Sequence, residues 1–235
     1  MRRKLLNSKT IGILTVLLVL FVATGLAEAE RTDAGGQWKY VLENGGATIT
    51  GWVEEPSGEL SVPHELDGYP VTAIGYGAFF MCVDLDGVSL PDSVTRIGAN
   101  PFVYCPEAFL SGPSDNPVFS NADGVLFEVQ QQMLVFYSGA KQGAYVIPEG
   151  TLRIGDSAFN ACEGLTSVTI PGSVESIGAN AFYDCVNLIS VTVPDRLVSI
   201  GEYAFAYCEN LTGVTLPASV TSIDEGASMS AANSS

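Results

Sequence analysis

Apolar residues recur along this chain in a fixed order, with a period of 23 residues. Each unit begins with an Ile-Gly pair, places a Phe five residues after the Ile, and places a Cys three residues after the Phe. Such self-similarity predicts a repeat architecture, in which units that cannot bury their apolar sides alone stack on one another. Units begin at Ile74, Ile97, Ile154, Ile177 and Ile200, and a degenerate sixth unit begins at Ile223.

The second half of each unit alternates apolar and polar residues. In the unit that begins at Ile154, Val168-Thr169-Ile170-Pro171 has the pattern of a short strand with one buried face, which the proline ends. In the first half, Ala158, Phe159 and Cys162 have the spacing of one helical or 3₁₀ turn with Phe and Cys inward. We therefore expect a β-rich solenoid whose strands lie about 4.8 Å apart in a parallel sheet.

Two stretches break the period and divide the chain. Residues 30–73 contain two Trp and alternating Val, Ile and Thr, and they predict an N-terminal cap with a first partial repeat. Residues 106–153 fall in an interval of 57 residues between Ile-Gly pairs, where Asp123-Gly124 between apolar alternations predicts an inserted β-hairpin in a divergent repeat. Regular repeats are expected over residues 74–105 and 154–223.

The two ends of the chain have their own patterns. Basic residues at the start precede an apolar stretch from Ile11 to Leu26, and Ala27-Glu28-Ala29 has the form of a cleavage site, so residues 1–29 predict a secretory signal peptide. The apolar stretch is shorter than the roughly 20 residues of a spanning helix, so we expect no membrane insertion after cleavage. Residues 224–235 are a degenerate tail, and we expect an open strand edge there with weak self-association.

The net charge excludes two kinds of partner. The full chain has a net charge of −16, and loss of residues 1–29 removes four of ten basic and one of 26 acidic residues, which leaves −19. A surface this acidic repels nucleic acid and anionic lipid. The Asp and Glu residues are scattered singly, as on a solvated surface outside the cell. We therefore expect a secreted or cell-surface protein that binds neither nucleic acid nor membranes.

No pattern in the sequence predicts catalysis or a cofactor. His64 is the only histidine, and one histidine in the cap is poorly placed to activate any of the repeated cysteines. The chain has no Cys-x-x-Cys pair for zinc, and Asp84-x-Asp86-Gly87 lacks the later ligands of a calcium loop. We therefore expect no enzyme activity, no metal and no cofactor.

The five cysteines all occupy one offset of the repeat. In-register stacking places equivalent Cβ atoms nearly 4.8 Å apart, beyond the mean of about 3.8 Å that a disulfide requires. Because their number is also odd, we expect buried thiols that act as small core residues. The alternative of one or two disulfides, which are common in exported proteins, stays open. The column consists of Cys82, Cys105, Cys162, Cys185 and Cys208.

The order Ile-Gly-x-x-Ala-Phe-x-x-Cys-x-x-Leu-x-x-Val-x-Leu-Pro-x-Ser-Val closely resembles the BspA-like class of leucine-rich repeats, over roughly residues 46–223. The resemblance implies a leucine-rich-repeat solenoid from a bacterial surface or secreted protein that binds proteins or host surfaces. It carries over no catalytic residue. The sequence departs from the pattern at Pro101, where Ala is usual, and at Ser228, where Phe is usual.

The strand face is the candidate binding site. Four hydroxyl residues share one strand offset, and stacking predicts that they form one surface: Ser89, Thr169, Thr192 and Thr215. The strong β-propensity of Thr is an alternative reason for the column. The leading hypothesis is a non-catalytic protein-binding or adhesion module whose partner is an extracellular or host-surface protein. The alternatives are a structural spacer or truncated fragment of a larger surface protein, and a secreted enzyme.

Overall fold

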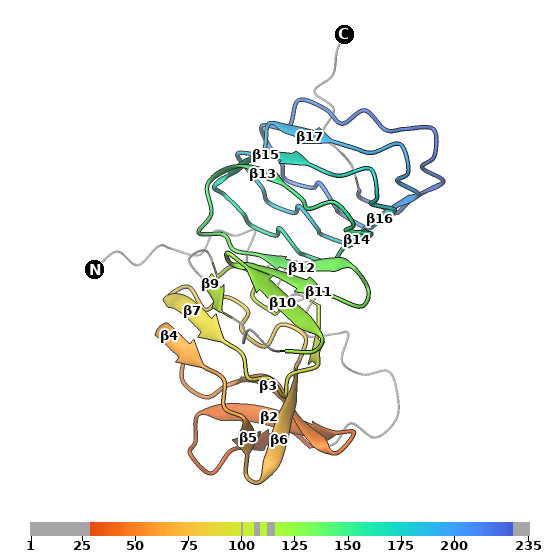
Figure 1. Ribbon diagram of the computed structural model, residues 1–235. Coiled ribbons are helices and arrows are strands. Elements are labelled where there is room, and N and C mark those ends of the chain that lie inside the picture. The colour runs from red at the N-terminus through yellow and green to blue at the C-terminus, as the bar shows by residue number, and fades with distance from the viewer. Residues whose placement is uncertain (1–28, 100, 106–108, 112–115, 228–235) are drawn as a thin grey trace, which may run out of the picture.

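The computed structural model describes residues 29–99, 101–105, 109–111 and 116–227. Within these residues the chain winds through stacked coils from an N-terminal cap toward the C-terminus (Figure 1). The regular structure of the described residues consists of strands, which form four sheets. The predicted signal peptide lies, up to residue 28, outside the described residues.

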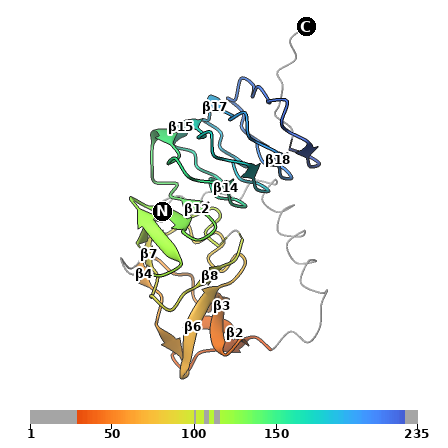
Figure 2. The same ribbon diagram turned by 45° about the vertical axis from the view of Figure 1, so that its right-hand side comes forward.

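Regular coils contribute to two parallel ladders, which follow different sides of the stack (Figure 2). One ladder pairs the Ile-Gly starts, so that Ile154 is the Cα partner of Ile177. The other pairs the Val-x-Ile segments, so that Val168 is the partner of Val191. The first ladder contains β14 (Arg153–Ile154), β16 (Ser176–Ile177), β18 (Ser199–Ile200) and β19 (Ser222–Ile223). The second contains β13 (Gly143–Val146), β15 (Leu165–Thr169) and β17 (Ser190–Thr192).

A β-hairpin closes the N-terminal end of the stack. β2 (Trp38–Glu43) pairs antiparallel with β3 (Gly46–Trp52) across Asn44-Gly45, whose positive φ angles of 51° and 82° suit a two-residue hairpin turn. β3 then pairs in parallel with β6. The same sheet includes β1 (Arg31–Thr32), β5 (Glu65–Leu66), β6 (Tyr69–Ile74) and β8 (Arg96–Ile97). A separate sheet contains β4 (Gly58–Ser61), β7 (Leu85–Ser89) and β9 (Phe109–Ser111).

The predicted hairpin insertion is confirmed, and it lies between the two halves of the stack. β10 (Phe119–Ala122) and β11 (Val125–Glu128) pair antiparallel around Asp123-Gly124, and β11 pairs with β12 (Met133–Tyr137). β12 then begins the C-terminal ladder by pairing in parallel with β14. Leu126 packs into the N-terminal core and its neighbour Val125 into the C-terminal core. The insertion therefore supplies the shared wall of both cores.

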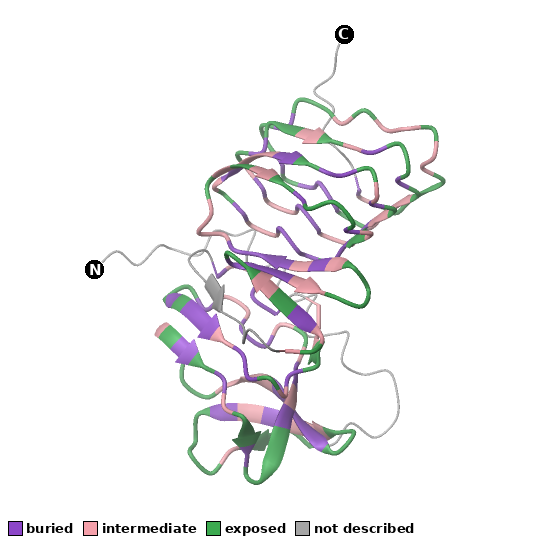
Figure 3. Ribbon diagram, in the orientation of Figure 1, coloured by how far each residue is buried: buried purple, intermediate pink, exposed green. Residues whose placement is uncertain are grey.

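Stacked phenylalanines form the interior of the coils. The ring of Phe182 lies 4.7 Å from that of Phe159 and 5.1 Å from that of Phe205, nearly parallel to both. Phe79 and Phe102 stack in the same way at 5.0 Å in the N-terminal half. Buried residues accordingly line the inside of the coils, and exposed ones follow the turns (Figure 3). The predicted β-rich solenoid of 23-residue units is therefore confirmed.

The helical turn expected between each Ile-Gly pair and its Cys is not confirmed, because the described segments are turns without helix. In the coil that begins at Ile154, two residues of this segment, Ser157 and Ala161, both have a positive φ of 55°. An α-helix needs negative φ at every residue. Every second backbone amide bonds instead to the next coil, from Ser157 to Ala179, from Phe159 to Ala181 and from Ala161 to Tyr183, while the amides between them bond to the carbonyl three residues back.

Candidate functional site

Two of the four predicted strand-face residues are direct neighbours. Thr169, at the end of β15, is the Cα partner of Thr192 on β17, and Val146 on β13 is its partner on the other side. All three residues are exposed. Val168 is buried, so the period of two along β15 turns the Thr169 side chain outward. The structure therefore presents hydroxyl groups on a regular, strand-spaced surface.

Ser89 and Thr215 do not belong to this sheet. Ser89 lies on β7 in the N-terminal half, where its hydroxyl donates to Oγ of Ser61 at 3.0 Å. Thr215 is exposed but lies in a segment without strand structure after β17. The hairpin insertion thus interrupts the single face that the common offset predicts, because Ser89 lies in the sheet of β4, β7 and β9, and Thr169 and Thr192 lie in the sheet of β13, β15 and β17.

The face around Thr169 and Thr192 has no charged residue on its strands, whose sequences are Gly-Ala-Tyr-Val, Leu-Thr-Ser-Val-Thr and Ser-Val-Thr. Ser167 and Ser190 are paired two residues before the two threonines. Val146 is 66% exposed, an unusual position for a large apolar side chain. We call this surface, made by β13, β15 and β17, the strand face. A partner can cover it without removing a charge from water.

The five cysteines are buried, as the sequence predicts, and the structure describes them as free thiols. Sγ of Cys185 donates to the carbonyl of Phe159 at 3.0 Å, and Sγ of Cys208 to that of Phe182 at 3.1 Å. Each of these bonds joins a cysteine to the phenylalanine of the preceding coil. Burial raises the pKa of the Cys162 and Cys185 thiols, which keeps them in the unreactive protonated form.

Thiol titration tests this arrangement. We expect few groups of the native mature protein to react with an alkylating reagent, because all five thiols are buried. Denaturation without a reductant is expected to expose all five. Labelling of only one or three thiols in the denatured protein, read from the mass, would show that disulfides exist.

Other candidate chemistry is sparse. His64 is exposed, and its carbonyl accepts the amide of Val71 at 2.8 Å. Within the described ranges, no group of three or more His, Cys, Asp or Glu residues is arranged to hold a metal ion. The described part of the chain also contains no helix that is long and apolar enough to cross a membrane.

Stacked 23-residue coils with two parallel ladders and a phenylalanine interior define a leucine-rich-repeat solenoid. The family model for the BspA type leucine-rich repeat region matches in six copies, over residues 66–111 and 132–233. This match covers more than half of the chain. The chain therefore belongs to the BspA-type leucine-rich repeat family.

Solved structures show the same fold. A leucine-rich cell surface protein from Faecalibacterium prausnitzii is similar with a TM-score of 0.55 and 21% sequence identity, over 88% of each chain. The pneumococcal vaccine antigen PcpA is similar with a TM-score of 0.51 and 16% identity, over 85% of this chain and 78% of that one. No curated protein matches the sequence. At these identities the likenesses support the fold.

Proposed function

We propose that this protein is a non-catalytic binding module that acts outside the cell and holds a partner protein on the strand face. The observation that carries the proposal is the exposed pair of Thr169 and Thr192 on an uncharged sheet of a strongly acidic protein. Export is supported by the signal-peptide pattern of residues 1–29 and by the cell-surface protein among the structural neighbours.

Repetition determines how such a face binds. Each threonine hydroxyl can donate and accept a hydrogen bond, and successive coils present these groups at the strand spacing of about 4.8 Å. Val146 adds apolar area beside them. Recognition is then distributed over several coils, each adding a modest increment, as on other solenoid surfaces. No single side chain is expected to be essential.

Surface substitutions test the proposal. The wild-type protein is first screened against an array of purified extracellular-matrix and cell-surface proteins. For a partner found there, Thr192→Arg is expected to lower the affinity about tenfold, since a bulky charge disturbs part of the face. The triple variant Thr169→Arg, Thr192→Arg, Thr215→Arg is expected to abolish binding, with an unchanged circular dichroism spectrum.

The matched control is Ser222→Arg, which adds the same side chain at an exposed hydroxyl of the other ladder. We expect it to bind as the wild type does. If the triple variant keeps the wild-type affinity, the binding site lies elsewhere. A loss of catalytic turnover after a single substitution such as His64→Ala would overturn the non-catalytic assignment itself.

A further inference from the structure

A second surface follows the turns that join the two ladders. We define the turn edge as the described residues that follow each repeat's first Ile, up to or just past its cysteine where it has one: 75–83, 98–99, 101–105, 155–163, 178–186, 201–209 and 224–227. These segments contain seven Asp and Glu residues and no Lys, Arg or His. The basic residues after the signal peptide all lie in other segments. The turn edge is therefore acidic in its C-terminal half, from residue 155 onward, and carries no charged residue in its two N-terminal segments.

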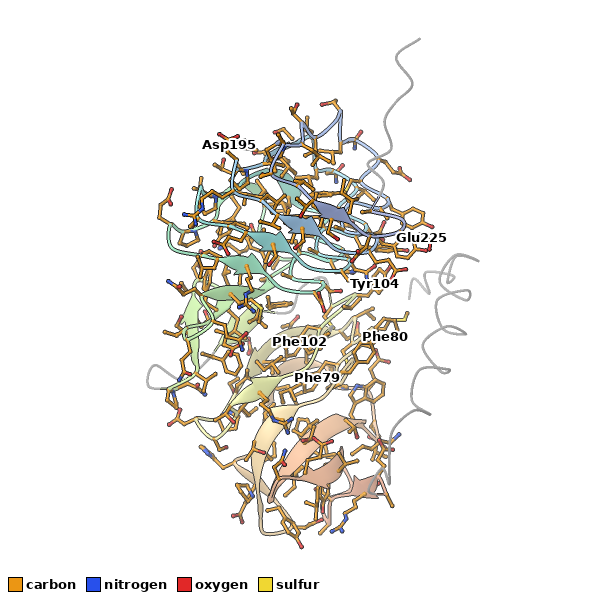
Figure 4. All side chains as sticks on the ribbon, turned by 90° about the vertical axis from the view of Figure 1, so that its right-hand side faces the viewer. Phe79, Phe80, Phe102, Tyr104, Asp195 and Glu225 are labelled. Carbon is orange, nitrogen blue, oxygen red and sulfur yellow. The ribbon has the colours of Figure 1, made fainter. Side chains whose placement is uncertain are left out.

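Aromatic side chains lie along the same edge. Tyr203 is 42% exposed and Tyr207 50% exposed. The ring of Tyr207 meets that of Tyr183 edge to face at 5.0 Å, and Tyr104 meets Phe80 in the same way at 5.9 Å. Figure 4 shows Phe80, Tyr104 and Glu225 along one margin of the molecule, with Asp195 near the opposite margin. Exposed tyrosines on a soluble surface are typical of interaction sites.

The hairpin insertion brings the tyrosines of the two halves together. Leu134 and Tyr145 are eleven residues apart, whereas their ladder partners Ile154 and Val168 are fourteen apart. The segment from Leu134 to Tyr145 is thus shorter than the segment from Ile154 to Val168 in the next coil, so the coil between the halves extends less far at the turn edge. Asp184 and Tyr207, both from the C-terminal half, help to raise the pKa of Tyr104 to about 12, after the larger effect of burial. The Tyr104 hydroxyl therefore lies within electrostatic range of both side chains.

Two polar atoms of the intervening coil lack partners. Ser157 is more than nine-tenths buried, and its Oγ has no hydrogen-bond partner among the described residues. The same is true of the enclosed Oδ1 of Asn160. Both residues belong to the turn edge, in the coil next to that of Tyr183. Because both atoms are enclosed, they add a local cost to this coil and are not part of the surface that a partner would meet.

We infer that the turn edge binds a segment of a partner protein that is rich in Arg and Lys, with the cationic groups placed over the tyrosine rings and beside the carboxylates. Guanidinium and ammonium groups are attracted to the faces of aromatic rings, and Arg brings five N–H donors. Carboxylates such as Glu202 and Glu225, both exposed, supply the complementary charge. The inference is independent of the strand face.

The test uses a fluorescein-labelled peptide of four Arg-Gly-Ser repeats, with its Gln-Gly-Ser counterpart as the neutral control, in fluorescence anisotropy at about 0.15 M salt. The Arg peptide is expected to bind the mature protein and the Gln peptide is not. Tyr203→Leu with Tyr207→Leu is expected to weaken binding about tenfold, since each ring contributes about two- to fivefold. Tyr203→Phe with Tyr207→Phe keeps both rings, and its affinity is expected to stay within about twofold.

Charge-matched variants separate this site from the general acidity of the protein. Glu202→Gln with Glu225→Gln removes two carboxylates from the turn edge, and Glu149→Gln with Asp195→Asn removes two exposed ones from other segments. We expect the first pair to weaken binding clearly more than the second. Equal weakening by both pairs would show a non-specific charge effect and would overturn the inference.

Two further outcomes would count against the inference. Unchanged affinity of the double Leu variant overturns the inference, because that variant keeps the net charge. Binding of neutral oligosaccharides that depends on the same tyrosines, without binding of the Arg peptide, also overturns it. Tyr207→Leu alone replaces the double variant if that one fails to fold, since the Tyr203 ring, which lies against Gly226, is then kept. Thr169→Ala with Thr192→Ala is expected to bind the peptide normally, so the two proposed sites fail separately.

Discussion

Replacement of Phe182 by Ala is expected to lower the free energy of unfolding by about 3–5 kcal/mol, the usual cost of deleting a buried phenylalanine. Phe182 has no exposed surface, and its ring stacks between those of Phe159 and Phe205. The neighbouring coils are joined to it through backbone bonds from Phe159 to Ala181 and from Phe182 to Ala204, which limit how far the cavity can collapse. Chemical denaturation followed by circular dichroism measures the change.

Phe182→Leu is the graded control. Leucine refills most of the volume, so a loss of about 1–2 kcal/mol is expected. Thr192→Ala, at an exposed strand position of the same coil, is expected to change stability by less than about 1 kcal/mol. A cost of Phe182→Ala no greater than that of Thr192→Ala would mean that the coils repack around the cavity, and that the phenylalanine column contributes little to the stability of the stack.

The sequence predicts the parts of the fold that repeat without interruption. Phe159, Phe182 and Phe205 are 23 residues apart, and because every coil is stacked in register, equal spacing in sequence becomes direct contact in space. The same argument places the cysteines in one buried column. Within the C-terminal half it also makes Thr169 and Thr192 neighbours.

Spacing alone fails where a coil is irregular. Ser89 shares the offset of Thr169, but the hairpin between them places the two residues in different sheets. Ser167 and Ser190 were not among the predicted site residues, although they are paired on the same strands. Val146 was not among them either, although the proline of Val146-Ile147-Pro148 aligns with that of Thr169-Ile170-Pro171 and the structure pairs Val146 with Thr169.

The ladder through the Ile-Gly pairs and the shape of the turns were also beyond the sequence pattern. Strands of two residues, such as β14 and β16, are too short to show an alternation of apolar and polar positions. The expected helical turn relied on the spacing of Ala, Phe and Cys, which is compatible with other conformations. Non-glycine residues with positive φ, such as Ala161 and Asp184, have no reliable signal in a single sequence. The signal that the sequence did offer for the turn edge was the presence of tyrosines in segments that contain no Lys, Arg or His.

The glycine of the Ile-Gly pair gives the second large effect, because two coils approach each other there backbone to backbone. A Cβ added at Gly178 would lie 2.6 Å from the amide nitrogen of Asp156 and 2.8 Å from the carbonyl carbon of Gly155. Real Cβ atoms essentially never come this close to backbone atoms, so Gly178→Ala must push two coils apart. The amide of Gly178 bonds to the carbonyl of Ile154 at 2.9 Å, and this bond would lengthen.

We therefore expect Gly178→Ala to lower the free energy of unfolding by about 1–3 kcal/mol, as overpacking of a well-packed interior does. Gly172→Ala is the matched control in the preceding coil, where an added Cβ meets nothing within 4 Å and φ is not left-handed. It is expected to leave stability unchanged or to raise it by about 0.4–1 kcal/mol, because alanine restricts the unfolded chain. In the last described coil Asp224 takes the glycine position and is exposed, which fits a coil that has no described neighbour on its far side. Equal stability of the Gly178→Ala and Gly172→Ala proteins in thermal unfolding would show that the interior coils can separate as freely as the terminal one, and that close backbone approach is not what requires glycine there.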